Sequence, residues 1–329
     1  MLRPRERENT AVLTPDELRI FHRDGCVAIP RITSPAEIAL LLEIFARLFA
    51  TGVGRRQGAQ YDMLSHEEDA APRTLPTIIN PIDYARELRD LEFRSNALHA
   101  ARQLLGPRAV PSFEHVILKP PHIGAATPWH QDEAYRVDAG FTYSQVSVWM
   151  PLQEATVENG CMHYLPGSHR FDVLPHKSPG NDSKVHAIEC VGDFDPMQGV
   201  SFPLPAGGAT LHHGRTLHYA GPNRTDSPRF AYILAFEIPP LRASKQRSFS
   251  WMTEKRTPSI LLKRQWRRRG GFVIEGWRKM RRGLWLRPRQ FMFEIYRAFR
   301  ALTPSSKCTD STEAPQNINH FRPRDGQPK

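Results

Sequence analysis

Apolar residues in the first third of the chain recur at helical spacing. Thr14 and Ser34 are each followed by Pro and, three residues on, by Glu, which is typical of a capped helix N-terminus. We expect one helix from residue 15 to Gly25, a short strand over 26–29, and a second helix from residue 35 to about Ala50. The second helix presents an apolar face formed by Ile38, Leu41, Leu42, Phe45, Leu48 and Phe49. A third helix is predicted over 83–105, before Gly106.

From about residue 112 the apolar period changes from 3.6 to 2, which favours strands. The predicted strands are 113–119, 143–153, 161–165, 185–190, 209–213 and 230–238. Asn159-Gly160 predicts a hairpin turn between two of them. The segments 51–82 and 170–205 have no clear period, and their length suggests loops that could cover a site. The pattern predicts an α+β chain whose second half is a sandwich or barrel.

Composition adds limits on compartment and class. The 329 residues are 40% hydrophobic and 24% charged, as in globular proteins. The four cysteines form no C-x-x-C pair, which argues against a cysteine zinc site and a disulfide framework, and favours a reducing compartment. The N-terminus lacks the apolar stretch of a secretory signal, and no segment is apolar enough to span a bilayer. We therefore expect a soluble, cytoplasmic protein.

The net charge of +11 is concentrated near the C-terminus. Residues 242–304 hold 18 Lys and Arg, three acidic residues and four of the six tryptophans. We expect a domain over 1–241, a basic helical extension over 242–304 and a disordered tail over 305–329. The extension suits peripheral binding to an anionic membrane surface, but also an acidic partner, a phosphorylated or CoA-like substrate, or packing on its own domain. Nucleic acid is the least favoured partner, because the rest of the chain is slightly acidic.

His130-Gln131-Asp132 places two metal-ligand side chains on the same face of an extended segment. A second His-x-Asp, at His22 and Asp24, lies at the end of the first helix, where the side chains diverge into solvent. The downstream segment 211–218 contains further histidines, and two histidines with one carboxylate form a facial triad that leaves three positions open on a metal such as Fe(II). An oxygenase needs this openness for a bidentate cosubstrate and dioxygen. Arg229 can then pair with the far carboxylate of a dicarboxylate cosubstrate.

Four segments in this order carry a more specific signal. They are LTPDELRIFHRDGCVAI (13–29), KPPHIGAATPWHQD (119–132), ENGCMHYLPGSHR (158–170) and HHGRTLHYAGPNRTDSPRF (212–230). Together they resemble the phytanoyl-CoA dioxygenase family, over roughly residues 13–240. The resemblance implies a double-stranded β-helix (jelly-roll, cupin-like) core with N-terminal flanking helices. It also implies Fe(II), 2-oxoglutarate and O2, with His130, Asp132 and His218 as iron ligands.

The same resemblance assigns cosubstrate contacts. It places Arg229 on the C5 carboxylate and makes Trp149, Gln131 and His115 neighbours of the cosubstrate. His115 stands where the family often has Met. Tyr219-Ala220 replaces a common Gly-Ser, so Ala220 lacks a hydroxyl that would help hold the far carboxylate. Asp132 is intact, whereas related halogenases replace this carboxylate, so hydroxylation is favoured over halogenation.

Two hypotheses of different class follow. The first is an Fe(II)/2-oxoglutarate-dependent hydroxylase that acts on an unactivated C–H bond of a small or lipid-like molecule and releases succinate and CO2. The second is a non-catalytic jelly-roll protein whose basic tail binds a membrane or a partner. The complete triad together with Arg229 favours the enzyme. Of the residues beside the triad, only one of His212 and His213 can face the interior of a strand, where it would support a ligand. The pattern does not name the substrate.

Overall fold

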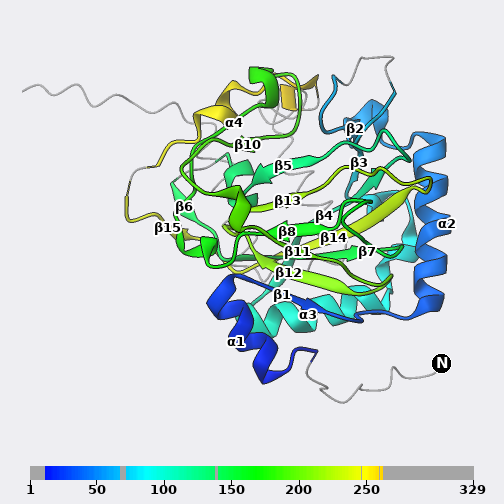
Figure 1. Ribbon diagram of the computed structural model, residues 1–329, viewed down its shortest axis with the longest axis horizontal. Helices are drawn as coiled ribbons and strands as arrows, with labels where there is room; N and C mark the ends of the chain where they lie inside the picture. Colours follow the sequence, from blue (N-terminus) through cyan, green and yellow to red (C-terminus); the bar gives the residue numbers. More distant parts are fainter. Residues whose placement is uncertain (1–11, 67–71, 138–139, 246, 259, 262–329) are drawn as a thin grey trace, which may run out of the picture.

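Two facing β-sheets, with helices on the outer face of the larger one, form the body of the described part of the chain, and two further sheets are pairs of short strands (Figure 1). The structure is a computed structural model and describes residues 12–66, 72–137, 140–245, 247–258 and 260–261. The helices are α1 (Pro15–Asp24), α2 (Pro35–Thr51), α3 (Glu92–Leu105) and α4 (Ser250–Glu254). The strands are β1 (Cys26–Ile29), β2 (Gln60–Asp62), β3 (Pro76–Ile79), β4 (Val110–Lys119), β5 (Thr127–His130), β6 (Phe141–Thr142), β7 (Gln145–Pro151), β8 (Met162–Tyr164), β9 (His176–Lys177), β10 (Glu189–Cys190), β11 (Val200–Phe202), β12 (Ala209–His213), β13 (His218–Ala220), β14 (Arg229–Glu237) and β15 (Leu241–Arg242).

The larger sheet has the order β1-β12-β7-β14-β4-β3-β2, and the smaller has the order β11-β8-β13-β5. Side chains along β7 point alternately to the two faces of the larger sheet, and each face contributes to a different hydrophobic core. Val148 and Met150 belong to the core shared with α2 and α3, whereas Trp149 belongs to the core shared with β8. The mixed helix and sheet architecture, with its two facing sheets, agrees with the predicted α+β jelly roll.

The helix starts follow the local sequence. Thr14 accepts a hydrogen bond from the Glu17 backbone N–H, and α1 ends at Gly25, whose φ is 78°. Ser34 caps α2 in the same way, but the Glu37 side chain does not return to it. Glu37 instead accepts hydrogen bonds from the backbone of residues 92 and 93, so it caps the start of α3. The third helix is therefore shorter than predicted, beginning at Glu92 after two 3-10 turns.

Two connections differ from the sequence-based expectation. Part of the predicted loop 51–82 forms β2 and β3, which extend the larger sheet beyond β4. Asn159-Gly160 makes a turn, with Gly160 at φ 86°, but the turn is not a hairpin. It joins β7 to β8, and these strands lie in different sheets. The hairpin prediction was wrong because the dipeptide specifies a reversal and not the pairing partner of the strand that follows.

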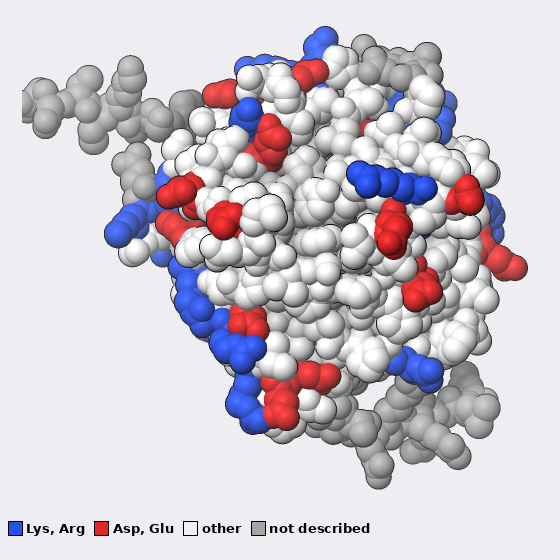
Figure 2. All heavy atoms as spheres, in the orientation of Figure 1, with Lys and Arg blue, Asp and Glu red and all other residues white. Residues whose placement is uncertain are grey.

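The chain beyond β14 is described only as far as residue 261. Phe249, Trp251 and Met252 of the α4 region pack with Ala134 and Ile188 in a third buried cluster. The predicted helical extension lies mostly outside the described residues, as does the predicted tail over 305–329. Within the described segments, no helix has the length and apolarity needed to cross a membrane. On the face drawn in Figure 2, acidic and basic side chains are interspersed among a larger number of uncharged residues.

Candidate metal centre

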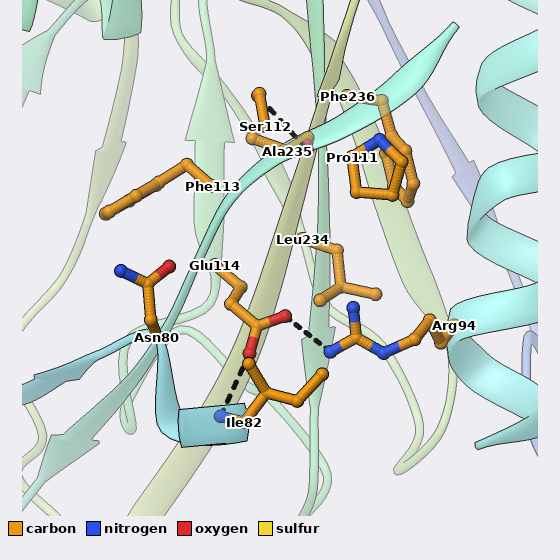
Figure 3. A pocket seen from close by; sticks show the side chains of 10 residues that line it. All are labelled: Asn80, Ile82, Arg94, Pro111, Ser112, Phe113, Glu114, Leu234, Ala235 and Phe236. Carbon is orange, nitrogen blue, oxygen red and sulfur yellow. Dashed lines mark hydrogen bonds and ion pairs between the residues drawn. The ribbon is translucent and has the colours of Figure 1, made fainter. Parts of the chain in front are cut away.

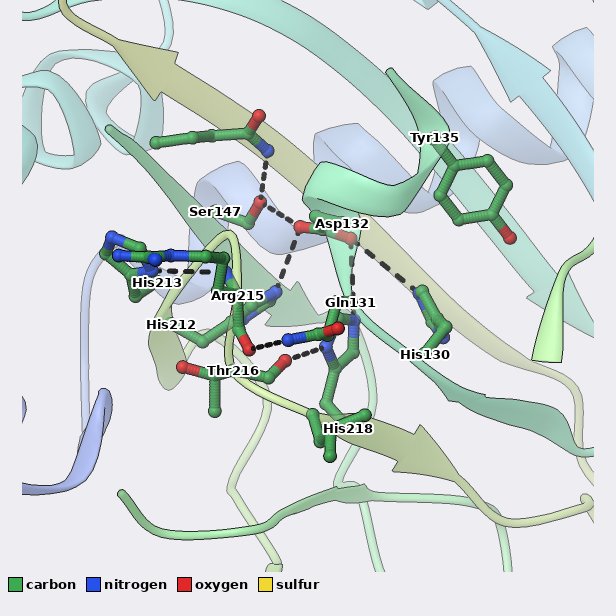
Figure 4. A network of polar contacts seen from close by, with 12 residues as sticks. His130, Gln131, Asp132, Tyr135, Ser147, His212, His213, Arg215, Thr216 and His218 are labelled. Carbon is green, nitrogen blue, oxygen red and sulfur yellow. Dashed lines mark hydrogen bonds and ion pairs between the residues drawn. The ribbon is translucent and has the colours of Figure 1, made fainter. Parts of the chain in front are cut away.

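Three potential metal ligands converge between the two sheets. His130 ends β5, Asp132 opens a 3-10 turn, η4 (Asp132–Tyr135), and His218 begins β13. Antiparallel pairing places His218 directly opposite His130. One ligand atom from each of the three side chains lies within 4.8 Å of the other two. The His-x-Asp spacing and the strand register thus assemble the predicted triad (Figure 4).

Backbone carbonyls orient both histidines of the triad. His130 Nδ1 lies 2.8 Å from the carbonyl oxygen of Pro128, and His218 Nδ1 lies 2.9 Å from that of Thr216. A carbonyl only accepts, so each Nδ1 carries the proton and each Nε2 has a free lone pair. These two Nε2 atoms lie 3.7 Å and 3.5 Å from Asp132 Oδ1. The imidazoles are therefore held in the tautomer that binds a metal.

The second oxygen of Asp132 is held by two side chains of the larger sheet. Ser147 Oγ donates to Asp132 Oδ2 at 2.6 Å, and His212 Nε2 lies 3.3 Å from the same oxygen. His212 Nδ1 lies 3.0 Å from the Tyr164 hydroxyl, which can donate to it. These contacts leave Asp132 Oδ1 facing the two histidines, so the carboxylate is oriented to bind a metal through one oxygen (Figure 4).

Burial and charge together set the protonation of the cluster. Burial raises the pKa of Asp132, but the charges and hydrogen bonds of His218, His130 and His212 outweigh it and hold this pKa well below its usual value. Burial, followed by the neighbouring His130 and His212, holds the pKa of His218 well below its usual value. An ionised carboxylate beside a neutral imidazole is the state that metal binding requires.

Arg229 begins β14 and is almost completely buried, with 1% of its surface exposed. Its guanidinium carbon lies 5.3 Å from the centre of the Trp149 ring. Its Nε makes one long hydrogen bond, 3.5 Å, to the Asn159 carbonyl, and its Nη1 is buried without a partner. Burial lowers the pKa of Arg229 to about 10, so the group is still a cation at neutral pH. A buried cation with an unpaired donor is costly unless an anion binds it.

Lys119 faces Arg229 across the β4–β14 pair and is also buried. Its ammonium group donates to the carbonyls of Ala125, Ala220 and Gly221. These contacts use all three of its donors, whereas Arg229 retains an unpaired one. Of these two buried cations, Arg229 is the one with a donor left for a ligand.

The remaining predicted site residues occupy different environments. His115 is buried on β4, and its Nδ1 has no hydrogen-bond partner. Burial lowers its pKa to about 4, with the neighbouring Asp132 acting in the opposite direction. The Gln131 side chain bonds to the backbone of Asp172, Leu174 and Arg215. Ala220 is buried beside His218, and its carbonyl accepts from Lys119.

Sequence reasoning missed Ser147 and Tyr135 and left His212 and His213 undecided. The structure places His212 against Asp132, while His213 accepts a hydrogen bond from the Arg215 backbone. The Tyr135 ring meets the His130 ring edge-on, with centroids 5.6 Å apart (Figure 4). The period-2 pattern of β12 was the available signal for His212, but it needed the facing sheet to fix its direction. His22 and Asp24 lie at the end of α1, as predicted.

A hollow lies on the helix side of the larger sheet, away from the triad. It is lined by residues of α3, β4 and β14, among them Arg94, Glu114 and Leu234 (Figure 3). Arg94 forms an ion pair with Glu114 and donates to the Tyr232 hydroxyl at 2.8 Å. Glu114 also accepts from the Ile82 backbone. Arg94 and Glu114 neutralise each other, so neither charge is left for a ligand, and we interpret the hollow as a packing gap and not as a binding site.

Comparison with known proteins agrees with this geometry. The model of the phytanoyl-CoA dioxygenase (PhyH) family matches residues 21–231. The chain belongs to this family. A probable alpha-ketoglutarate-dependent hypophosphite dioxygenase of Stutzerimonas stutzeri is 26% identical over 224 residues, which cover 67% of this chain and 77% of that protein. A phytanoyl-CoA dioxygenase of Arabidopsis thaliana is 27% identical over 260 residues, covering 68% and 89%. EvdO2 of Micromonospora carbonacea var. aurantiaca, solved with 2-oxoglutarate, is 37% identical with a TM-score of 0.62, covering 73% and 97%.

Membership of the PhyH family confirms the predicted enzyme class, an Fe(II)/2-oxoglutarate-dependent dioxygenase. The His-Asp-His group is a suitable place for the iron. The family match covers α2, α3 and the strands from β1 to β13, and it ends within β14. Residues 247–258, which pack against the η4 turn, lie beyond it.

Proposed function

We propose that this chain binds Fe(II) through His130, Asp132 and His218 and hydroxylates an unactivated C–H bond of a small or lipid-like substrate. The observation that carries the proposal is the convergence of three ligand atoms within 4.8 Å beside a buried, unpaired guanidinium. Three protein ligands leave three positions on an octahedral metal. A bidentate 2-oxo acid and dioxygen need all three.

The unpaired Nη1 of Arg229 supports its assignment to the far carboxylate of 2-oxoglutarate. A guanidinium binds a carboxylate through two parallel hydrogen bonds, which would satisfy the buried donors. Trp149 lies against the guanidinium and would limit its movement. Ala220 offers no hydroxyl, so Arg229 carries most of the polar recognition of that carboxylate.

His115 and Gln131 take different roles in this proposal. His115 has an unpartnered nitrogen in the metal region, and a donor there can contact the cosubstrate or dioxygen side of the site. The Gln131 side-chain amide is hydrogen-bonded to backbone groups of Asp172, Leu174 and Arg215. We therefore place Gln131 as a support for the ligand segment, near the cosubstrate but not bound to it.

When bound, iron and 2-oxoglutarate would activate O2, the oxidant: one oxygen atom would enter the succinate that forms with CO2, and the other would enter the substrate as a hydroxyl group. The protein holds two imidazoles, oriented by backbone carbonyls at Nδ1, and one carboxylate in fixed orientation. It binds the distal carboxylate through Arg229 and surrounds the reacting region with buried side chains that exclude water. The intact carboxylate of Asp132 favours hydroxylation over halogenation.

Succinate formation tests this function. Protein loaded with Fe(II) under anaerobic conditions is mixed with 2-oxoglutarate, exposed to O2 and assayed for succinate with pooled candidate substrates. We expect slow uncoupled turnover that one pool accelerates, with a product 16 mass units heavier than its substrate, which is the mass of one added oxygen atom. No succinate from protein that has bound iron would support the non-catalytic alternative instead.

We also propose peripheral membrane association through the basic segment 242–304. Its charge and tryptophan content support this, since basic amphipathic helices bind anionic lipid surfaces. Residues 249–252 pack against the domain, so the informative deletion begins after residue 261. Loss of sedimentation with anionic vesicles on deletion of 262–329 is the expected result. Equal sedimentation of both proteins would exclude this role for the deleted part.

A further inference from the structure

Side chains of residues 247–255 reach the turn that carries Asp132, although this segment lies beyond the family match, which ends at residue 231. Arg247 donates from Nη2 to Glu133 Oε1 at 2.8 Å and from Nη1 to Asp172 Oδ1 at 3.0 Å. It also donates to the Phe141 carbonyl. Glu133 directly follows Asp132 and is 1% exposed. Arg247 therefore neutralises a buried carboxylate next to the proposed ligand.

Trp251 holds the following residue of the same turn. Its indole Nε1 donates to the Ala134 carbonyl at 2.9 Å. Its ring lies 5.5 Å from that of His176, and His176 Nε2 accepts a hydrogen bond from the Gln131 backbone N–H at 3.2 Å. Trp251 thus anchors Ala134 directly, and it packs on the His176 ring that accepts from the Gln131 backbone.

Lys255 extends these contacts to the segment that covers this region. Its ammonium group is buried and donates to Ser178 Oγ at 2.9 Å, to the Val185 carbonyl at 2.7 Å and to the Ala187 carbonyl at 2.5 Å. Arg247 contacts the same segment through Asp172. Segment 247–255 therefore joins the η4 turn to residues 172–187.

We propose that residues 247–255 form a strap that positions Asp132 for metal binding. The η4 turn spans only Asp132–Tyr135, and outside contacts hold the residues on each side of the ligand. A carboxylate ligand binds tightly only when its neighbours fix its direction. The strap residues are positioning residues, because Arg247 and Trp251 contact the residues that follow Asp132 in the turn. The proposal rests on the proposed function, in which Asp132 is a metal ligand.

The direction in which metal affinity changes when Arg247 is replaced distinguishes positioning of Asp132 from a simple electrostatic effect. Replacing Arg247 by Met removes a cation and leaves the Glu133 carboxylate near the metal with only its longer ion pair, 3.7 Å, to Arg215 Nε. Coulomb attraction alone would then tighten the binding of a divalent cation. Loss of positioning would weaken it. The direction of change in metal affinity therefore decides between the two causes.

The test is calorimetric titration of the full-length protein with Mn(II) under anaerobic conditions, so that binding is measured without turnover. We expect about tenfold or greater weakening in Arg247→Met and a smaller loss in Trp251→Phe, which removes only the indole donor. Arg256→Ala is the matched control, because that guanidinium bonds to carbonyls of its own segment. Unchanged or tighter binding in Arg247→Met would overturn the strap. A wild-type protein that does not bind the metal would overturn the proposed function instead.

Hydrogen exchange provides a readout that does not depend on the metal. In metal-free Trp251→Phe and Arg247→Met, we expect amides of residues 131–136 and 172–188 to exchange faster together, while those of α2 keep their wild-type rates. Faster exchange in both segments is expected because the strap residues contact both of them. Wild-type exchange rates in 131–136 for both variants would show that the strap does not hold the turn.

Discussion

His212 Nε2 lies 3.3 Å from Asp132 Oδ2, the carboxylate oxygen that does not face the triad histidines. Its Nδ1 lies 3.0 Å from the Tyr164 hydroxyl, which in turn lies 2.7 Å from Thr210 Oγ1. The arrangement is self-consistent if Tyr164 donates to Nδ1 and His212 donates from Nε2 to the carboxylate. Asp132 is thereby held for binding through one oxygen.

The first prediction concerns His212. His212→Phe retains an aromatic ring but removes the donor to Asp132, so we expect metal affinity to fall about 10- to 100-fold. His213→Asn is the control, because His213 follows on the same strand and its ring nitrogen Nδ1 accepts a hydrogen bond from the Arg215 backbone. Equal metal dissociation constants for His212→Phe and the wild type would show that His212 does not orient the carboxylate.

The second prediction concerns Arg229. Arg229→Met removes the charge-assisted hydrogen bonds to the cosubstrate, each worth about 1.5–3 kcal/mol. We expect the apparent KM for 2-oxoglutarate to rise at least about tenfold, with a smaller change in kcat. Thermal stability without cosubstrate should not fall, because the variant also removes an unpaired buried cation. A lower melting temperature with an unchanged KM would mean that Arg229 has a structural role only.

The third prediction concerns the triad. His130→Ala and Asp132→Ala each remove one of three metal ligands, and we expect 2-oxoglutarate turnover to be abolished. The fold should persist, because the two larger cores do not include these side chains. Circular dichroism and succinate release measure the two outcomes separately. Normal turnover by either folded variant would place the metal elsewhere.

The fourth prediction is a pH dependence of stability at Lys255. Burial lowers its pKa from 10.5 to about 8, and the nearby Asp182 only partly offsets this. Between these two values the unfolded chain binds more protons than the folded chain, so stability rises with pH across this window. The total change is at most about 3 kcal/mol. Urea unfolding of wild type and Lys255→Met from pH 7.5 to 10 measures it as a growing difference in favour of the wild type. A constant difference would contradict the lowered pKa.

Local signals were sufficient for much of the fold. The caps at Thr14 and Ser34 and the alternation of 209–213 depend on neighbouring residues, and the structure confirms them. The short strands β5 and β13 were missed because three or four residues show no period. Their strand conformation comes from the pairing of His218 with His130. Likewise, β2 and β3 depend on the edge that β4 presents to them.

The site divides in the same way. The triad was predictable because His130 and Asp132 are two residues apart and the distal His218 lies in a recognisable segment. The residues that support the triad could not be predicted from the sequence. Ser147, Tyr164 and Arg247 lie 15, 32 and 115 positions from Asp132 along the chain. Such contacts are set by sheet register and by the return of the chain after β14. No local pattern encodes them.

Metal-dependent binding of 2-oxoglutarate tests the central claim most directly. Wild-type protein and Asp132→Ala are titrated anaerobically with 2-oxoglutarate, each with and without one equivalent of Fe(II). The account predicts that Fe(II) strengthens 2-oxoglutarate binding by wild type, with the absorption band of a 2-oxo acid chelated to iron, and that Asp132→Ala shows neither. Iron-independent binding, or equal binding by both proteins, would contradict a 2-oxoglutarate oxygenase centre built on this triad.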